Sequence, residues 1–86
     1  MKTYRVLVDN EGRLYKDGDA VKLVLNGTKE GTYIGYIQTV GVQMLTMKFY
    51  NKETNTFNEE QLLDLNVITK IEPIYPIWLK EESELW

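Results

Sequence analysis

The chain has 86 residues, which is enough for one small domain and too few for two. It carries a formal net charge of −3 and contains neither cysteine nor histidine, which excludes disulfides, thiolate metal ligands and histidine-based proton transfer. No apolar run approaches the roughly 20 residues that a membrane helix needs, and the first residues do not resemble a signal peptide. We therefore expect a cytoplasmic protein that does not contact membranes.

The composition favours strands over helices. Alanine occurs once, whereas valine, isoleucine and threonine together account for 21 of the 86 residues. The charge is unevenly distributed, because residues 1–57 hold eight basic and six acidic side chains and residues 58–86 hold two basic and seven acidic ones. We interpret this as a mildly basic body followed by an acidic C-terminal third.

The first predicted element is a strand over residues 3–9, with Tyr4, Val6 and Val8 on one face. Residues 10–12 then have the composition of a three-residue hairpin loop, with Gly12 in the left-handed conformation. A short strand over 13–16 follows, and Asp17-Gly18-Asp19 forms the next turn. Two aspartates around a glycine resemble part of a calcium loop, but the other oxygen ligands are missing, so we predict a turn without metal.

Residues 19–50 are predicted to form three consecutive antiparallel strands. Residues 20–25 alternate with period two and place Val21, Leu23 and Leu25 on one apolar face. The dipeptide Asn26-Gly27 favours a type I′ hairpin turn, because both positions tolerate positive φ. The alternative is a longer loop that Gly31 closes.

The second and third strands of this region are predicted over 32–40 and 43–49. Residues 32–40 carry apolar side chains on both faces, so we expect this strand to be covered on both sides. Gly35 in its middle weakens a strand unless the strand bends sharply there. Gly41 predicts a tight turn or a bulge. In the third strand Leu45, Met47 and Phe49 share one face.

The remaining elements are predicted to close the domain. A polar loop covers 51–56, and we expect Phe57 to anchor its far end to the core. Residues 58–61 have the form of a capping box, which predicts a short helical turn over 59–64. Val67–Glu72 is the expected closing strand. The predicted organisation is a small β-barrel domain over 1–72 and an acidic, aromatic tail over 73–86.

These elements predict an all-β fold, a small SH3-like or Sm-like barrel of five to six antiparallel strands with one short helical turn near 59–64. Residues 21–45 resemble the first motif of Sm-like RNA-binding proteins. The matching residues are Val21, Leu23, Asn26-Gly27, Gly35, Ile37 and Met44. Where that family holds an RNA base with Asp and Asn, this chain has Gly41 and Leu45, and no arginine stands within Asn66–Thr69. The resemblance therefore implies the barrel and does not imply RNA binding of the Sm type.

The inventory of reactive groups predicts that the protein is not an enzyme. Beyond the missing histidine and cysteine, the single serine, Ser83, lies among glutamates that disfavour a nucleophilic alkoxide. Three pairs of neighbouring carboxylates occur, and all fall in predicted turns, helix starts or the tail (Asp17 and Asp19, Glu59 and Glu60, Glu81 and Glu82). Solvated acids are the norm at such places. We expect no cofactor, no metal and no small-molecule substrate.

The aromatic residues are the candidate partner-binding groups: Tyr33, Tyr36, Tyr50, Trp78 and Trp86. Tyrosines on barrel strands more often pack in the core or at its rim, where the ring is buried and the hydroxyl stays wet. Large aromatic side chains nevertheless suit protein contacts, because they lose little conformational entropy on binding. Our first hypothesis is a binding module for a protein partner or for a second copy. Small acidic barrels are also similar to accessory proteins of phages and mobile elements that inhibit host factors.

The alternative is a divergent nucleic-acid-binding barrel. In it the tyrosines would stack on bases, and four lysines would contact phosphates: Lys22, Lys29, Lys48 and Lys52. The sequence pI of about 4.9 argues against this alternative, since nucleic-acid-binding domains are usually basic. A third hypothesis is an acidic inhibitor that mimics nucleic acid.

Overall fold

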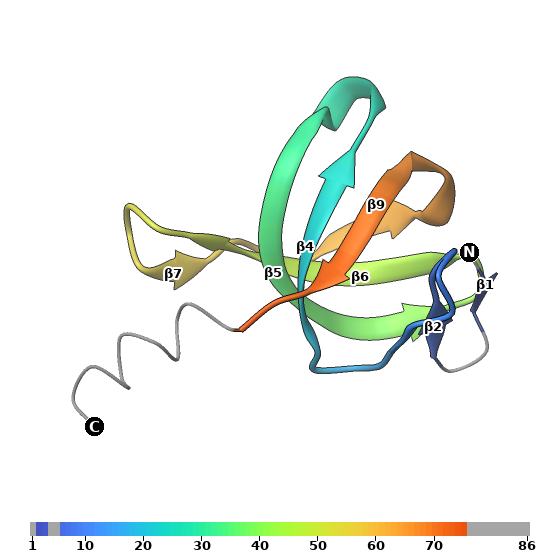
Figure 1. The fold of residues 1–86 in the computed structure, drawn as a ribbon. Helices are drawn as coiled ribbons and strands as arrows, with labels where there is room; N and C mark the ends of the chain where they lie inside the picture. Colours follow the sequence, from blue (N-terminus) through green and yellow to red (C-terminus); the bar gives the residue numbers. More distant parts are fainter. Residues whose placement is uncertain (1, 4–5, 76–86) are drawn as a thin grey trace.

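The computed structural model describes residues 2–3 and 6–75, and these form an antiparallel β-structure (Figure 1). The strands are β1 (Lys2–Thr3), β2 (Leu7–Val8), β3 (Leu14–Tyr15), β4 (Ala20–Leu25), β5 (Gly31–Gly41), β6 (Met44–Asn51), β7 (Thr56–Phe57), β8 (Gln61–Asp64) and β9 (Ile68–Pro73). Two 3₁₀ helices, η1 (Gly27–Lys29) and η2 (Leu65–Val67), are the helical elements of the described residues. The prediction of an all-β fold is confirmed.

The strands make two sheets. In the larger sheet the strand order is β7-β6-β5-β4-β9. The sixth strand, β8, also pairs with β6, along a different part of that strand from β7. The smaller sheet has the order β1-β2-β3. β9 pairs antiparallel with β4, with Leu23 opposite Ile71 and Val21 opposite Pro73. The last strand of the described residues thus lies beside the first strand of the larger sheet and forms one end of its strand order.

Strand β5 is long and curved, and it belongs to both halves of the larger sheet (Figure 1). Its residues 31–36 pair with β4, whereas Gly35 and later residues pair with β6. A register shift between Ile37 and Thr39 marks a bulge, which increases the local bend. Gly35 sits where the two partners overlap. A Cβ atom there would lie 2.2 Å from the carbonyl oxygen of Lys48, so only glycine permits this approach.

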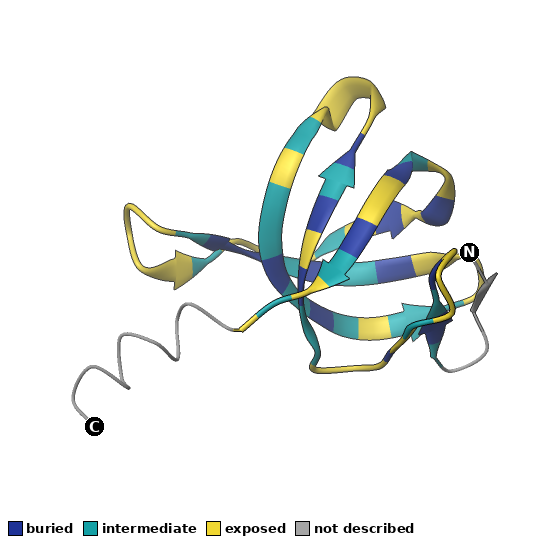
Figure 2. Cartoon of the chain, in the orientation of Figure 1, coloured by how far each residue is buried: buried dark blue, intermediate teal, exposed yellow. Residues whose placement is uncertain are grey.

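The core lies inside this curved sheet and is built from alternating positions (Figure 2). The predicted inward faces of β4 and β6 are confirmed, since all six of their side chains are buried: Val21, Leu23, Leu25, Leu45, Met47 and Phe49. The N-terminal sheet adds Leu7 and Tyr15, β5 adds Ile37, and the C-terminal elements add Leu63, Leu65, Ile68 and Ile71. One continuous apolar cluster therefore joins residues from both sheets.

The N-terminal strand differs from its prediction. Residues 3–9 are not one strand, because β1 and β2 pair with each other and Thr3 stands opposite Leu7. Leu7 is fully buried, while Val6 and Val8 are half-buried. Three consecutive apolar residues fit either face of a strand, so their alternation could not decide which one enters the core.

The following two turns match their predictions. Gly12 has φ +83°, and the amide of Asp9 donates to the carbonyl of Arg13 at 3.0 Å across the three-residue loop. Gly18 has φ +93° in the turn that the amide of Asp19 closes on the carbonyl of Lys16. The two turns before β4 thus use glycine where positive φ is required.

The connection between β4 and β5 is the longer of the two predicted alternatives. Gly27 has φ +87°, but Asn26 has φ −117°, so a type I′ turn is wrong because it needs positive φ at both residues. The chain instead makes the 3₁₀ helix η1 and returns at Gly31, which stands opposite Leu25. The tight turn predicted at Gly41 is present, since Gly41 pairs with Met44 around a two-residue loop.

The helical turn predicted over 59–64 is misplaced. Residues 61–64 form β8, in which Leu63 stands opposite Leu45 and is buried. The 3₁₀ turn comes later, at η2, where the carboxylate of Asp64 accepts from the amide of Asn66 at 2.8 Å. The amide of Asn58 donates to the carbonyl of Phe49. Pairing with β6 buries Leu63 in the common core, and an isolated capped turn has no such partner.

Candidate functional site

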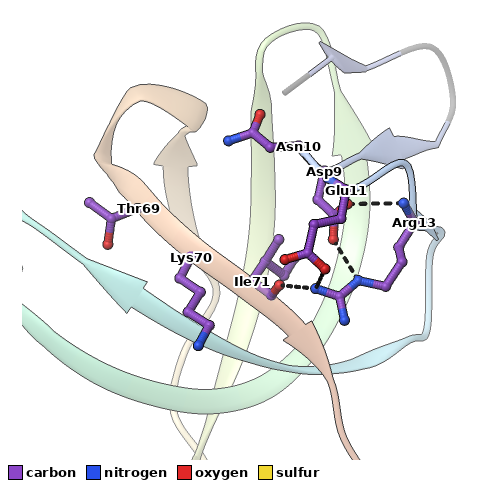
Figure 3. A pocket seen from close by; sticks show the side chains of 7 residues that line it. All are labelled: Asp9, Asn10, Glu11, Arg13, Thr69, Lys70 and Ile71. Atoms are coloured by element: carbon purple, nitrogen blue, oxygen red, sulfur yellow. Dashed lines mark hydrogen bonds and ion pairs between the residues drawn. The ribbon is translucent and has the colours of Figure 1, made fainter.

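A polar cluster lies between the β2–β3 hairpin and β9 (Figure 3). Asp9 is only 8% exposed, and its carboxylate accepts from the amides of Glu11 and Arg13, both at 2.9 Å. It also accepts from Nε of Arg13 at 2.9 Å and from the hydroxyl of Tyr15 at 2.8 Å. Four donors thus satisfy one buried carboxylate, as burial of a charge requires.

These contacts shift three pKa values. Burial by itself raises the pKa of Asp9, but the hydrogen bonds from Tyr15, Arg13 and Glu11 outweigh it and lower the pKa to about 2. Burial, together with the hydrogen bond to Asp9, raises the pKa of Tyr15 to about 12. The hydrogen bond to Asp9 also raises the pKa of Arg13 above its usual value. All three shifts move the pKa values further from neutrality.

The cluster joins parts of the chain that are far apart in sequence. Nη2 of Arg13 donates to the carbonyl of Ile71 on β9 at 3.3 Å, and it lies 3.1 Å from the carboxylate of Glu11 (Figure 3). The small cavity beside it is lined in addition by Asn10, Thr69 and Lys70. Sequence reasoning missed this cluster. The sequence feature that could have indicated it is Asp9 at the first position of a turn, where an aspartate side chain commonly accepts hydrogen bonds from backbone amides.

Two of the predicted tyrosines come together on the outer face of the larger sheet. The rings of Tyr36 and Phe57 have centroids 5.0 Å apart, and those of Tyr50 and Phe57 are 5.5 Å apart. We call these three residues the aromatic row. Tyr36 and Phe57 are half-buried, whereas Tyr50 is 9% exposed and its hydroxyl donates to the side chain of Asn55.

Tyr33 lies on the opposite face of β5. Its ring packs at 4.9 Å from that of Phe49, and its hydroxyl donates to the carbonyl of Lys29 at 2.9 Å. Tyr33, Tyr36 and Tyr50 therefore do not form one platform, because residues 33 and 36 are an odd number of positions apart on a strand. Trp78 and Trp86, the other two predicted partner-binding residues, lie outside the described residues.

A groove opens where β5 and β6 diverge, and we call it the strand notch. Pairing of the two strands ends at Gly35 and Phe49. Residues 31–34 of β5 keep β4 on one side, and the described residues supply no strand on the other side. The strand notch is lined by Thr32, Tyr33, Ile34, Phe49, Tyr50, Asn51, Lys52, Glu53 and Asn58. It combines aromatic and aliphatic surface with side-chain amides and the edge of a strand.

The lysines proposed for phosphate contacts come from different elements of the chain. Nζ of Lys22 lies 3.7 Å from the carboxylate of Glu72, and Nζ of Lys29 donates to the side chain of Gln61. Lys48 is on β6, and Lys52 follows in the loop that lines the strand notch. The lysines are thus spread over four elements, and two of them already interact with neighbouring side chains.

Of the three pairs of carboxylates, Asp17 and Asp19 make contacts within the fold, Glu59 and Glu60 are exposed, and Glu81 and Glu82 lie outside the described residues. The carboxylate of Asp17 accepts from the amide of Val40 at 3.0 Å, and that of Asp19 accepts from the amide of Lys16 at 2.9 Å. Across residues 2–3 and 6–75, no group of three or more acidic side chains is arranged to hold a metal ion. In the same residues no helix has the length and apolar character required to cross a bilayer.

Comparisons of the chain with protein-family models, with curated proteins and with solved structures found no match.

Proposed function

We propose that this protein is a non-enzymatic binding module that acts through protein–protein contacts, and that the strand notch receives an extended segment of the partner. One observation carries the proposal. Pairing between β5 and β6 ends at Gly35 and Phe49. Beyond that point, one edge of β5, beside Tyr33 and Ile34, has no strand partner in the described chain. An edge with free backbone groups next to apolar side chains is the usual substrate for strand addition.

The notch supplies both parts of such recognition. The backbone of residues 31–34 can exchange hydrogen bonds with an added strand, which gives affinity without requiring a particular sequence. Tyr33 and Ile34 lie on opposite faces of β5 and offer contacts to alternate side chains of the added segment. Asn51 and Asn58 add side-chain amides at the rim.

The nucleic-acid alternative has less support. The chain is acidic, and the side chains of Lys22 and Lys29 interact with Glu72 and Gln61. A phosphate-binding surface needs several lysines or arginines side by side. We further propose that the protein acts in the cytoplasm. We also propose that it is an accessory or host-factor-inhibiting protein of a phage or mobile element. Both proposals rest on the size and charge of the chain.

The test compares two variants that each introduce a glutamate, one at a half-buried and one at an exposed position, in affinity capture from an extract of the native host. Ile34→Glu places a charge in the strand notch, and Leu62→Glu places the same charge on β8, where Leu62 is 64% exposed. We expect a protein that is captured by the wild type and by Leu62→Glu and that is lost with Ile34→Glu. Capture that both variants retain equally would refute the notch as the site.

A nuclease-treated extract and a salt series complete the experiment. Contacts made by aromatic side chains and backbone groups should change little between low and high salt, and nuclease should not affect them. Loss of the captured protein after nuclease treatment, or a steep fall of affinity with salt, would instead support nucleic-acid binding.

A further inference from the structure

Two glycines of the chain follow an aspartate or an asparagine, namely Gly18 after Asp17 and Gly27 after Asn26. At such a pair the backbone nitrogen of the glycine can attack the side-chain carbonyl carbon of the preceding residue, because glycine has no side chain that hinders the approach. The reaction needs a side chain that is free to turn and a nitrogen that no other group holds. The two pairs differ in both respects.

The fold holds both reacting groups of the pair Asp17-Gly18. The carboxylate of Asp17 accepts from the amide of Val40 at 3.0 Å. The amide of Gly18 donates to the carbonyl of Ile37 at 2.6 Å. A carboxylate is also charged at neutral pH, which makes its carbon a poor target for a nucleophile. These contacts disfavour the reaction at Asp17.

The pair Asn26-Gly27 lies in the connection between β4 and β5, where residues 26–30 are all exposed (Figure 2). The side chain of Asn26 makes no capping hydrogen bond to η1, although asparagine often makes one at this position. Gly27 is the first residue of η1, so its amide has no acceptor within that helix. Neither reacting group is therefore held by the helix that follows.

The surroundings of the pair leave room for the rotation that the attack requires. Apart from the chain neighbours, no atom lies within 4 Å of the place that a Cβ of Gly27 would occupy. Two other asparagines show the contrast. The side chain of Asn51 accepts from the amide of Glu53 at 3.0 Å, and that of Asn55 accepts from the hydroxyl of Tyr50. Lysine and threonine, both larger than glycine, follow these two asparagines.

We propose that Asn26 is a site of spontaneous deamidation through a cyclic imide formed with Gly27. The nitrogen of Gly27 gives its proton to hydroxide and attacks Cγ of Asn26. A C–N bond forms and the bond from Cγ to Nδ2 breaks, so that Nδ2 takes a proton from water and leaves as ammonia. Water then opens the imide. Opening at Cγ leaves aspartate, and opening at the backbone carbonyl carbon of residue 26 leaves isoaspartate.

The isoaspartate product changes the backbone as well as the charge. Its main chain runs through Cβ and Cγ of residue 26, so the connection becomes one carbon atom longer. The amide of Asn26 donates to the carbonyl of Val67 at 2.9 Å, and Gly31 stands opposite Leu25 where β5 begins. A longer connection between these two fixed points should destabilise the start of β5. This inference does not depend on the proposed function, since the reaction needs no partner.

The test is incubation of the folded, full-length protein in warm, mildly alkaline buffer, followed by digestion with trypsin and mass spectrometry. The peptide of residues 23–29 should gain one dalton and separate into an aspartate and an isoaspartate form. Its conversion should exceed that of each other asparagine by about tenfold or more, because a larger residue follows each of them. The rate should rise with pH, since the attacking nitrogen must lose a proton. The peptide of residues 17–22 should contain no isoaspartate.

Two variants and one peptide serve as controls. Asn26→Gln keeps an exposed amide but requires a six-membered ring, so it should gain no mass. Gly27→Ala should slow the conversion by about tenfold or more. A synthetic peptide of residues 23–29 gives the rate without the fold, and the folded protein should react within about tenfold of that rate. A slower reaction in the folded protein, or equal conversion at Asn51 or Asn55, would overturn the proposal.

A stability measurement tests the effect on the backbone. The isoaspartate form, isolated by chromatography, should unfold at a lower urea concentration than Asn26→Asp, which carries the same charge on an unaltered main chain. Equal urea midpoints would overturn the inferred destabilisation of β5.

Discussion

Gly35 of β5 and Lys48 of β6 approach each other so closely that a single added carbon at residue 35 would overlap the carbonyl oxygen of Lys48, at 2.2 Å. This contact is between two backbones, so no side-chain rotation can relieve it. It fixes the point at which β5 changes from one neighbouring strand to the other.

We therefore predict that Gly35→Val destabilises the protein by about 3–5 kcal/mol or prevents folding, because backbone overlap forces the two strands apart. Urea unfolding followed by circular dichroism measures the change. Gly41→Ala is the matched control. Its Cβ would lie 3.1 Å from the side chain of Met44, which can move, so a loss of at most about 1 kcal/mol is expected. Equal losses for both variants would contradict the close approach.

The Asp9 cluster predicts loss of stability in acid. The pKa of Asp9 is about 2 in the folded protein, and an unfolded aspartate has a pKa of about 3.9. The folded state therefore binds a proton less readily. The stabilisation is present above about pH 4 and is lost as the pH falls toward 2.

The measurement is the melting temperature between pH 2 and 6 for wild type, Asp9→Asn and Glu11→Gln. Asp9→Asn should have a lower melting temperature than the wild type at pH 6. Its melting temperature should also fall less steeply as the pH is lowered toward 2. Glu11→Gln, an exposed position in the same loop, should keep the wild-type slope. An unchanged slope in Asp9→Asn would show that other carboxylates cause the acid transition.

Strand β8 predicts a contrast between two adjacent leucines. Leu63 is 3% exposed and Leu62 is 64% exposed. Leu63→Ala should cost about 2–4 kcal/mol, since it leaves a cavity opposite Leu45, and Leu62→Ala should change stability by about 0.5 kcal/mol or less. Chemical denaturation gives both values. Similar costs for the two variants would be inconsistent with a strand that buries only one of these faces.

The core position of Leu45 predicts that the protein does not bind RNA in the Sm manner. Leu45 is fully buried, and Gly41 carries no side chain, so neither can hold a base as the family's Asn and Asp do. Fluorescence anisotropy with uridine-rich and adenine-rich oligonucleotides at physiological salt should show no micromolar binding. Micromolar binding, or a ring of six or seven subunits by light scattering, would restore the resemblance as a functional one.

Much of the fold could be predicted because the alternation in β4 and β6 favours one buried face. Polar residues or turns separate Val21, Leu23 and Leu25 from the next apolar run, so the spacing of these residues fits the period of two that is typical of a strand. The run around Leu62 and Leu63 is too short to distinguish a strand from a helical turn. The strand that pairs with this run, β6, lies about sixteen positions earlier in the chain, and only that pairing makes residues 61–64 a strand rather than a helical turn.

The candidate site was harder to predict for the same reason. Alternation already separates Tyr33 from Tyr36, but nothing local shows that Phe57 returns to pack between Tyr36 and Tyr50. The strand notch depends on where two pairings stop, which is a property of the assembled sheet. The Asp9 cluster likewise needs the carbonyl of Ile71, far away in the sequence.

The pairing of β9 with β4 has a consequence for the order of folding. Strands β4, β5 and β6 follow one another through loops of two to five residues, so their closure costs little entropy. Val21 and Pro73, in contrast, are about fifty positions apart in the chain when they meet. We expect the three strands β4, β5 and β6 to pair early and β9 to pair with β4 in the last step. The folding rate should therefore depend on that late pairing between distant segments rather than on the bend of β5 at Gly35.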